Sequence, residues 1–188
     1  LYGVEYAVIR SIARYQPVND AVETGAYILY QGAVNEGRSF ETLIPAMQFV
    51  EQPLWICGDG NFMAQARALV AQYGLQHKVI FKGMVAPESL RHITIKARIG
   101  LTLFEGDARS NYFSLANRFF DYMQAGVPQI CMDYPVYREL NNRHQIAVLI
   151  HDRSPENLAR EINGLLQDET RWKQMRENCK QASAILNW

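Results

Sequence analysis

Short apolar runs alternate with segments of helical periodicity along most of this chain, and that alternation constrains its fold more than any other feature. The apolar runs predict strands at 26–32, 53–60, 78–83, 98–104, 127–132 and 146–150. Successive parallel strands need a crossover connection, and a helix supplies it. The pattern therefore predicts an α/β fold, with one doubly wound, mainly parallel sheet of about six strands and helices on both faces.

Glycine, proline and asparagine mark several expected helix boundaries. We expect Asn61 to cap one helix and Gly74 to end it, while Pro87 suits the first turn of the next. Pro45 removes a backbone hydrogen bond unless it lies in the first turns of its helix or kinks it. Helices are predicted over 38–50, 61–74, 86–97, from Ser114 to Gly126, and over 134–142, 154–167 and 168–186.

Composition excludes several classes of protein. The formal net charge is zero, which does not suit a nucleic-acid surface or a polybasic membrane patch. The longest apolar runs are about six residues, against the roughly 20 that span a bilayer. The first residues lack the pattern of a signal peptide, and the chain begins without Met, so we expect a piece of a longer protein. Residues 4–9 could add an edge strand, and residues 15–25 indicate a connecting loop.

The nucleophilic and metal-binding residue types form no recognisable site. Cys57, Cys131 and Cys179 lack metal-like spacing, and we expect them to be buried reduced thiols, which fits a cytosolic setting. The four histidines are scattered without an HxxH pattern, so no metal site is indicated. Ser110 and Ser114 lack the GxSxG elbow of a serine hydrolase.

Polar clusters occur at predicted carboxyl ends of strands, which is where open α/β sheets bind ligands. The loop "GAVNEG" begins at Gly32 and leads to Arg38 at the start of a helix. Free N–H groups and a cation converge there, which favours an anion site, although a plain turn with a solvated arginine also explains these residues. The "GDG" at 58–60 is not a dinucleotide fingerprint, and a tight turn is favoured over a phosphate loop.

The helix predicted from Ser114 carries polar side chains at i, i+3, i+4 and i+7, namely Ser114, Asn117, Arg118 and Asp121. At the helix start, the Ser114 hydroxyl and the next N–H groups could hold a phosphate. Further along, Asp121 could accept hydrogen bonds from paired sugar hydroxyls. The alternative is a surface pair of Arg118 with Asp121, which contributes little energy. The spacing does not decide between them.

Taken in order, these segments resemble the donor-binding, C-terminal half of a GT-B glycosyltransferase of the bacterial family 4 type, whose enzymes are retaining. The segment "NRFFDYMQAGVP" (117–128) is similar to the family's "pNK-f-EYm-aaG-P", and "YQGAVNEGR" (30–38) is similar to its first phosphate loop. The resemblance covers roughly residues 26–180. It implies a Rossmann-like sheet, one half of a GT-B fold, and a single nucleotide-sugar-binding domain over 1–188 without its N-terminal acceptor domain.

The resemblance also implies roles for individual residues. Asp121 stands where the family has a glutamate that binds the nucleotide ribose. Arg38 stands where a lysine or arginine contacts the donor diphosphate, which makes it the implied catalytic residue. Gly32 belongs to the loop that approaches the diphosphate. The other implied donor-binding residues are Ser114 and Leu115 through backbone N–H groups, Gly83, Met84 and Val85 (with Lys82) along the nucleobase, and Glu105, Asn117 and Arg118.

The chain departs from the family pattern at several positions. Many members carry a glutamate eight residues before the ribose-binding acid, where this chain has Phe113. The acid that binds the sugar is therefore expected to be either missing or moved, to Glu105 or Asp107. Ala33 replaces the arginine that often follows the first-loop glycine. Arg118 replaces the family's usual lysine, and Asp121, which is one methylene shorter, replaces its ribose-binding glutamate.

The expected activity is that of a retaining, metal-independent, hexosyltransferase-like enzyme in bacterial polysaccharide or glycan biosynthesis. Arg38, the loop N–H groups and the helix N-terminus would stabilise charge on the departing nucleoside diphosphate. The nucleotide-sugar is a substrate, so no cofactor is implied, and there is no DxD metal motif. The isolated fragment is expected to bind nucleotide weakly and to transfer nothing.

The expected partners are a nucleotide-sugar donor and the N-terminal domain of the same chain, with no nucleic acid. The expected location is cytoplasmic, with peripheral membrane association through the other domain. Two alternatives remain open, a GT-B-fold nucleotide-sugar epimerase and a non-enzymatic doubly wound interaction domain. The second predicts an acidic pocket near the first strand, whereas the strand "AYILYQG" ends without an aspartate.

Overall fold

The computed structural model describes residues 12, 15–18, 25, 27–106 and 109–187. The edge strand expected at 4–9 lies outside these residues. Most of the loop expected at 15–25 does as well, and its described residues form neither helix nor strand. Within the described residues, no helix has the length and apolar character needed to cross a membrane.

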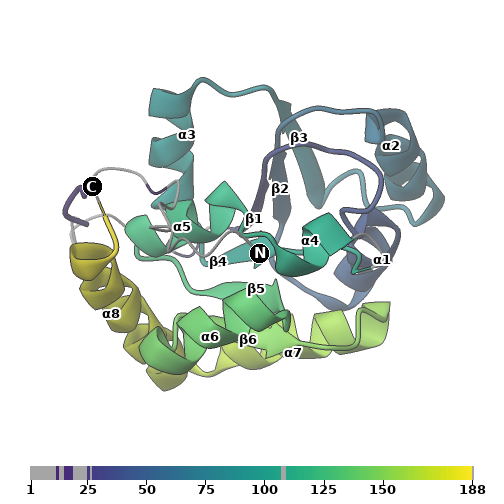
Figure 1. Ribbon diagram of the computed structural model, residues 1–188. Helices are drawn as coiled ribbons and strands as arrows, with labels where there is room; N and C mark the ends of the chain where they lie inside the picture. The colour runs from purple at the N-terminus through teal and green to yellow at the C-terminus, as the bar shows by residue number, and fades with distance from the viewer. Residues whose placement is uncertain (1–11, 13–14, 19–24, 26, 107–108, 188) are drawn as a thin grey trace, which may run out of the picture.

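Six strands form one sheet in the order β3-β2-β1-β4-β5-β6, and every neighbouring pair is parallel (Figure 1). The strands are β1 (Ile28–Gln31), β2 (Leu54–Cys57), β3 (Val79–Gly83), β4 (Ile99–Thr102), β5 (Gln129–Met132) and β6 (Ala147–Ile150). The doubly wound parallel sheet predicted from the sequence is confirmed. Each strand is one to four residues shorter than its apolar run, because the ends of the runs belong to the connecting loops.

The helical elements are α1 (Phe40–Ala46), the 3-10 turn η1 (Met47–Phe49), α2 (Met63–Gln72), α3 (Pro87–Thr94), α4 (Arg109–Phe113), α5 (Asn117–Gln124), α6 (Pro135–His144), α7 (Pro155–Gln167) and α8 (Glu169–Ile185). Pro87 opens α3 as predicted, and Gly74 follows α2 with a φ of +66°. Pro45 lies at the end of α1, where the helix gives way to η1.

Asn61 does not cap α2, contrary to expectation. The helix begins later, at Met63, and Phe62 at its N-cap makes no side-chain cap hydrogen bond. The Asn61 Oδ1 instead accepts from the Glu36 N–H over 3.1 Å, and the Asn61 N–H donates to Asn35 Oδ1 over 3.1 Å. These bonds tie the loop after β1 to the loop after β2.

The helix predicted from Ser114 begins three residues later than expected, and a further short helix precedes it. Residues 109–113 form α4 where a loop was expected, and α5 begins only at Asn117. Between them, Ala116 has an extended backbone (φ −79°, ψ 137°), and its N–H donates to the Tyr137 hydroxyl over 2.9 Å. No glycine or proline marks the non-helical segment between α4 and α5, so the periodicity of the sequence did not reveal it.

Alternate residues of β1 pack into different layers, which places the sheet between helices. Ile28 and Tyr30 belong to the larger core, with residues of α1, α2 and α7. Leu29 belongs to a smaller core with Tyr122 of α5, on the side where α3 and α5 lie (Figure 1). Gly100 lets α5 approach β4, because a Cβ there would meet the Tyr122 ring at 2.5 Å.

The strand order reverses at β1. The chain passes outward from β1 through β2 to β3, and α3 then returns it to β4 on the other edge of β1. The loops that leave β1 and β4 therefore diverge and leave a crevice at their carboxyl ends, the usual ligand position of this architecture.

Candidate functional site

Three adjoining cavities lie at this crevice. The α3–α5 cavity has a volume of about 400 Å³, the glycine-loop cavity about 260 Å³ and the arginine cavity about 320 Å³. Gln31 and Asp121 line both the α3–α5 cavity and the arginine cavity, and Gly32 lines the other two. Leu90 lines all three, so the cavities adjoin one another around its side chain.

Two guanidinium groups lie in the arginine cavity. Arg118 of α5 is buried, with its Cζ 4.4 Å from the ring centre of Tyr30 and 4.9 Å from that of Phe104. Arg38 lies over the same Phe104 ring at 4.7 Å, and its Nη1 donates to Asn111 Oδ1 over 3.1 Å. The aromatic faces hold both cations in place without neutralising them.

Both arginines have buried nitrogens that lack partners. Among the described residues, nothing accepts a hydrogen bond from Arg38 Nε or Arg118 Nη1. Burial, and then repulsion by Arg118, lower the pKa of Arg38. Unpaired buried donors and uncompensated charge are costly, so the arrangement suits an anion that carries several acceptor oxygens.

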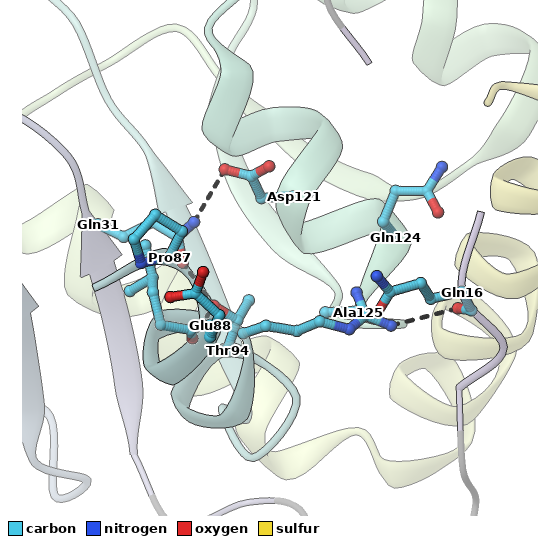
Figure 2. Close-up of a pocket in the computed structure, with 10 residues that line it drawn as sticks. Gln16, Gln31, Pro87, Glu88, Thr94, Asp121, Gln124 and Ala125 are labelled. Carbon is cyan, nitrogen blue, oxygen red and sulfur yellow. Dashed lines mark hydrogen bonds between the residues drawn. The ribbon is translucent and has the colours of Figure 1, made fainter. Parts of the chain in front are cut away.

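Asp121 lines both the arginine cavity and the α3–α5 cavity, and Figure 2 shows its hydrogen bond to Gln31 in the α3–α5 cavity. Its Oδ2 accepts from Gln31 Nε2 over 3.0 Å, and Thr94 Oγ1 donates to Gln31 Oε1 over 2.8 Å. Burial raises the pKa of the Asp121 carboxyl, while the hydrogen bond from Gln31 and the charges of Arg118 and Arg91 oppose that rise. The Asp121 carboxylate is thus a hydrogen-bond acceptor that lies near the charges of Arg118 and Arg91.

The "GDG" segment at 58–60 is an irregular loop, with the turn following at 61–62, and its first amide is already occupied. The Gly58 N–H donates to the Gly83 carbonyl over 2.8 Å, and the Gly32 N–H donates to the Cys57 carbonyl over 2.9 Å. The Gly60 N–H donates to Asp59 Oδ1 over 2.8 Å. The tight turn that the sequence favoured is therefore not found at 58–60, where the glycines instead allow close packing of loops.

Neither a disulfide nor a metal-binding cluster is found among the residues that the structure describes. The three cysteines are free and buried, as expected. Across the part of the chain that the structure describes, no three His, Cys, Asp or Glu side chains are grouped so that they could hold a metal ion.

The model of the family described as Glycosyl transferases group 1 matches residues 11–184. The chain belongs to this family. A search of curated protein sequences found no match.

Solved structures of other glycosyltransferases share the fold of this group 1 domain. HepE of Anabaena in complex with UDP has a TM-score of 0.73 at 15% identity, over 87% of this chain and 45% of HepE. A mutant of TarM of S. aureus, in complex with Fondaparinux, alpha-GlcNAc-glycerol and UDP, has a TM-score of 0.79 at 12% identity, over 100% of this chain and 38% of TarM. The C-terminal domain of LpcC, a group 1 family protein of Francisella tularensis, has a TM-score of 0.70 at 15% identity, over 87% of each chain.

The chain therefore has the fold of the C-terminal domain of a GT-B glycosyltransferase, and that resemblance is confirmed. It spans less than half the length of HepE or TarM. At these identities the structures establish the fold alone.

The structure of the group 1 domain brings most of the sequence-predicted residues together. The arginine cavity is lined by Gly32, Arg38, Ser114, Asn117, Arg118 and Asp121. Met84 and Val85 line the glycine-loop cavity beside Gly32. The surface pair of Arg118 with Asp121 is the wrong interpretation, because Arg118 is only 8% exposed.

Four predicted residues line none of the three cavities, among them Lys82, whose Nζ lies 3.7 Å from the centre of the Trp55 ring. Glu105 has its carboxylate 3.9 Å from Arg153, and its carbonyl accepts from Asn111. The Gly83 carbonyl accepts a hydrogen bond from the Gly58 N–H, and the Leu115 side chain packs against the core. Asp107 lies outside the described residues.

Ser114 faces the arginine cavity but does not begin a helix. The expectation that a helix begins at Ser114 is therefore wrong. The extended backbone of Ala116 moves the start of α5 to Asn117.

Sequence reasoning missed several residues of the site. Gln31, Thr94 and Arg91 line the α3–α5 cavity, and Asn111 holds Arg38. One signal was available for Gln31, a polar residue at the last position of an otherwise apolar strand, directly before a glycine. The others lie on helices with no such contrast.

Proposed function

We propose that this chain is the donor-binding domain of a glycosyltransferase, which moves a sugar from a nucleotide-sugar to an acceptor. The observation that carries the proposal is a pair of arginines in the cavity that Asp121 also lines: Arg38 Nε and Arg118 Nη1 are buried and have no hydrogen-bond partner among the described residues. Two cations fit a diphosphate, and a carboxylate fits vicinal ribose hydroxyls. The UDP bound in the structures of HepE and TarM supports a nucleotide as the ligand.

In this proposal the arginines also act in the reaction. When the bond between sugar and diphosphate breaks, negative charge grows on the departing nucleoside diphosphate. Arg38 and Arg118 are already fixed on Phe104, so they stabilise that charge with little reorganisation. We propose accordingly that transfer needs no metal ion, that it proceeds with retention as in family 4 enzymes, and that the donor carries a hexose.

The organisation of the whole enzyme belongs to the same proposal. We propose that residues 1–188 form a single nucleotide-sugar-binding domain and that an acceptor domain completes the cleft. The chain's coverage of 45% of HepE and 38% of TarM supports this arrangement. A cytoplasmic location, with peripheral membrane attachment through the other domain, fits polysaccharide or glycan synthesis. The chain alone would bind nucleotide weakly and transfer nothing.

Calorimetric titration of UDP, GDP, ADP and CDP into the chain tests donor binding. We expect one nucleotide to bind at micromolar to millimolar concentration, and Asp121→Ala and Arg118→Met to weaken it about tenfold or more. Arg67→Met is the control, since Arg67 also lies over an aromatic ring, that of Phe81, but lines none of the three cavities. Folded chain that binds none of the four at millimolar concentration would contradict the proposal.

Transfer and epimerisation share the same donor site and differ in their products. Product analysis with the full-length enzyme, the nucleotide-sugar and an acceptor distinguishes them. Transfer yields a glycosylated acceptor and free nucleoside diphosphate, whereas an epimerase acting without an acceptor yields an altered sugar. The second result would replace the proposed reaction while leaving donor binding intact.

A further inference from the structure

Gln31 is a buried amide whose side-chain partners lie in the crevice. It ends β1, is 3% exposed and lines both the arginine cavity and the α3–α5 cavity. Its Oε1 accepts from Thr94 Oγ1 over 2.8 Å, and its Nε2 donates to Asp121 Oδ2 over 3.0 Å. A buried amide costs free energy unless it is hydrogen-bonded, and an apolar residue could fill this strand position. The hydrogen bond to Asp121 therefore explains why a polar glutamine occupies this buried strand position.

A second buried glutamine shows the same chemistry in a structural setting. Gln129 in β5 accepts from Thr102 Oγ1 over 2.7 Å, but its Nε2 donates to the Phe119 carbonyl over 3.1 Å. It is 0% exposed and lines none of the three cavities. The two glutamines differ in what the amide holds, a backbone carbonyl in one case and a carboxylate at a cavity wall in the other.

The bond to Gln31 leaves the other carboxylate oxygen available. Asp121 Oδ1 accepts no hydrogen bond from the residues that the structure describes, whereas Oδ2 is held by Gln31. Thr94 fixes the amide in turn, since its hydroxyl lies 2.8 Å from both Gln31 Oε1 and the Leu90 carbonyl. Fixing one oxygen fixes the plane of the carboxylate. A ligand hydroxyl thus meets an acceptor whose orientation is set before binding.

We infer that Gln31 is a positioning residue that orients Asp121 toward vicinal ribose hydroxyls, so that the domain selects ribonucleotides over nucleotides lacking those hydroxyls. This rests on the proposed function and adds the residue that makes its ribose contact selective. Gln31 acts through Asp121. The site accordingly uses a relay of Thr94, Gln31 and Asp121 in place of a lone carboxylate.

The charges around Asp121 give the relay a pH dependence. Arg118 on the same helix and Arg91 across the cavity on α3 favour the ionised carboxylate, as does the hydrogen bond from Gln31, while burial opposes it. Glu88 of α3 also lines the α3–α5 cavity. Loss of Gln31 therefore raises the pKa of Asp121 further, and the ionised acceptor is lost at a higher pH.

The test compares each ribonucleoside diphosphate with its 2′,3′-dideoxy counterpart, using UDP, GDP, ADP and CDP between pH 5 and pH 8. Phosphate and base titrate alike in both members of a pair. The ratio of their affinities therefore isolates the ribose contact. For the wild-type chain we expect a ratio of about tenfold or more at pH 8 for the nucleotide that binds, falling toward acid pH as Asp121 is protonated.

Gln31→Met keeps the size of the side chain and removes both hydrogen bonds. We expect this variant to lower the ratio at least about fivefold and to move its fall to higher pH. Gln129→Met loses a comparable buried amide and should leave the ratio and its pH dependence unchanged. Thr94→Val should shift both in the same direction as Gln31→Met, by less.

The outcomes separate this inference from the proposed function. Equal weakening of the ribonucleotide and its dideoxy counterpart by Gln31→Met would make Gln31 merely structural and overturn the inference, while donor binding stands. A wild-type ratio near one would do the same. Failure of the folded wild-type chain to bind any of the nucleotides would overturn both.

Discussion

The backbone of Gly58 passes so close to Gly32 that a Cβ on Gly58 would lie 1.9 Å from the Gly32 carbonyl oxygen. Gly58 also has a φ of +142°, outside the range that side chains accept readily. The loops that follow β1 and β2 are therefore in direct backbone contact, and they form the wall of the glycine-loop cavity. A side chain at Gly58 has no room unless that wall moves.

Gly58→Ala should be strongly destabilising for this reason. We expect a loss of about 3–5 kcal/mol in the free energy of unfolding, measured by urea denaturation. Gly74→Ala is the matched control, because Gly74 also has positive φ but a Cβ there would meet no atom within 4 Å, and it should cost only about 1–2 kcal/mol. Equal losses in the two variants would show that the contact with Gly32 is unimportant.

Arg38→Met should weaken nucleotide binding without weakening the fold. It removes one of two cations that repel each other across the arginine cavity, so the melting temperature without ligand should stay the same or rise. Affinity for the bound nucleotide should fall about tenfold or more, and its dependence on salt concentration should become shallower. Calorimetry at two salt concentrations measures both effects, and a drop in melting temperature with unchanged affinity would assign Arg38 a structural role.

Inorganic pyrophosphate should stabilise the chain, because it satisfies both arginines without a base or ribose. The rise in melting temperature should grow with the logarithm of pyrophosphate concentration above its dissociation constant. Arg118→Met should abolish the rise, while Asp121→Asn should retain it. Thermal denaturation followed by circular dichroism measures this, and an unchanged response in Arg118→Met would exclude Arg118 from the anion site.

Asp121→Asn should raise stability at neutral pH relative to the wild type. Burial raises the pKa of Asp121 above its ordinary value of 3.8, so the folded state holds the proton more tightly than the unfolded state. Wild-type stability therefore declines as pH rises from about 3.8 to the higher folded pKa, and the asparagine variant lacks that decline. Urea denaturation at a series of pH values should show the difference appear in this window and then level off.

The three cysteines should not react with a thiol reagent in the folded chain. Burial raises the pKa of Cys57 to about 11 and also raises the pKa values of Cys131 and Cys179, so little thiolate exists at pH 8. Ellman's reagent should therefore label none of them quickly in buffer and all three in denaturant. A fast reaction in the folded chain would mean that the glycine-loop cavity, which Cys57 lines, opens readily.

Sequence patterns predicted the sheet well because parallel strands are buried on both faces and stand out as short apolar runs. Every strand lies within its predicted run, and apart from the unexpected α4 the order of strands and helices is as predicted. The patterns failed where the cause is a single backbone angle or a distant partner. The extended backbone angle ψ of Ala116 delays the start of α5. The Asn61 side chain accepts a hydrogen bond from the loop after β1, much earlier in the chain, and so does not cap α2.

The site was predictable where residue type and position agreed. Arg38 after a glycine loop and Asp121 on a polar stripe both face the arginine cavity. Burial was not predictable, since a polar stripe is normally solvated, and Arg118 is covered by Tyr30 and Phe104. Gln31 depends on Thr94 and Asp121, both at least 63 residues away, which local periodicity does not detect.

The reversal of strand order at β1 has a consequence for how the chain matures. The first half of the chain can form β1, β2 and β3 as it leaves the ribosome. The arginine cavity, however, is lined both by Arg38, which precedes β4 in the chain, and by Asp121, which follows β4. Until β4 pairs with β1, that inner strand has an open edge able to capture other strands. A donor nucleotide therefore cannot assist early folding, and a chain truncated before β4 would be an aggregation hazard.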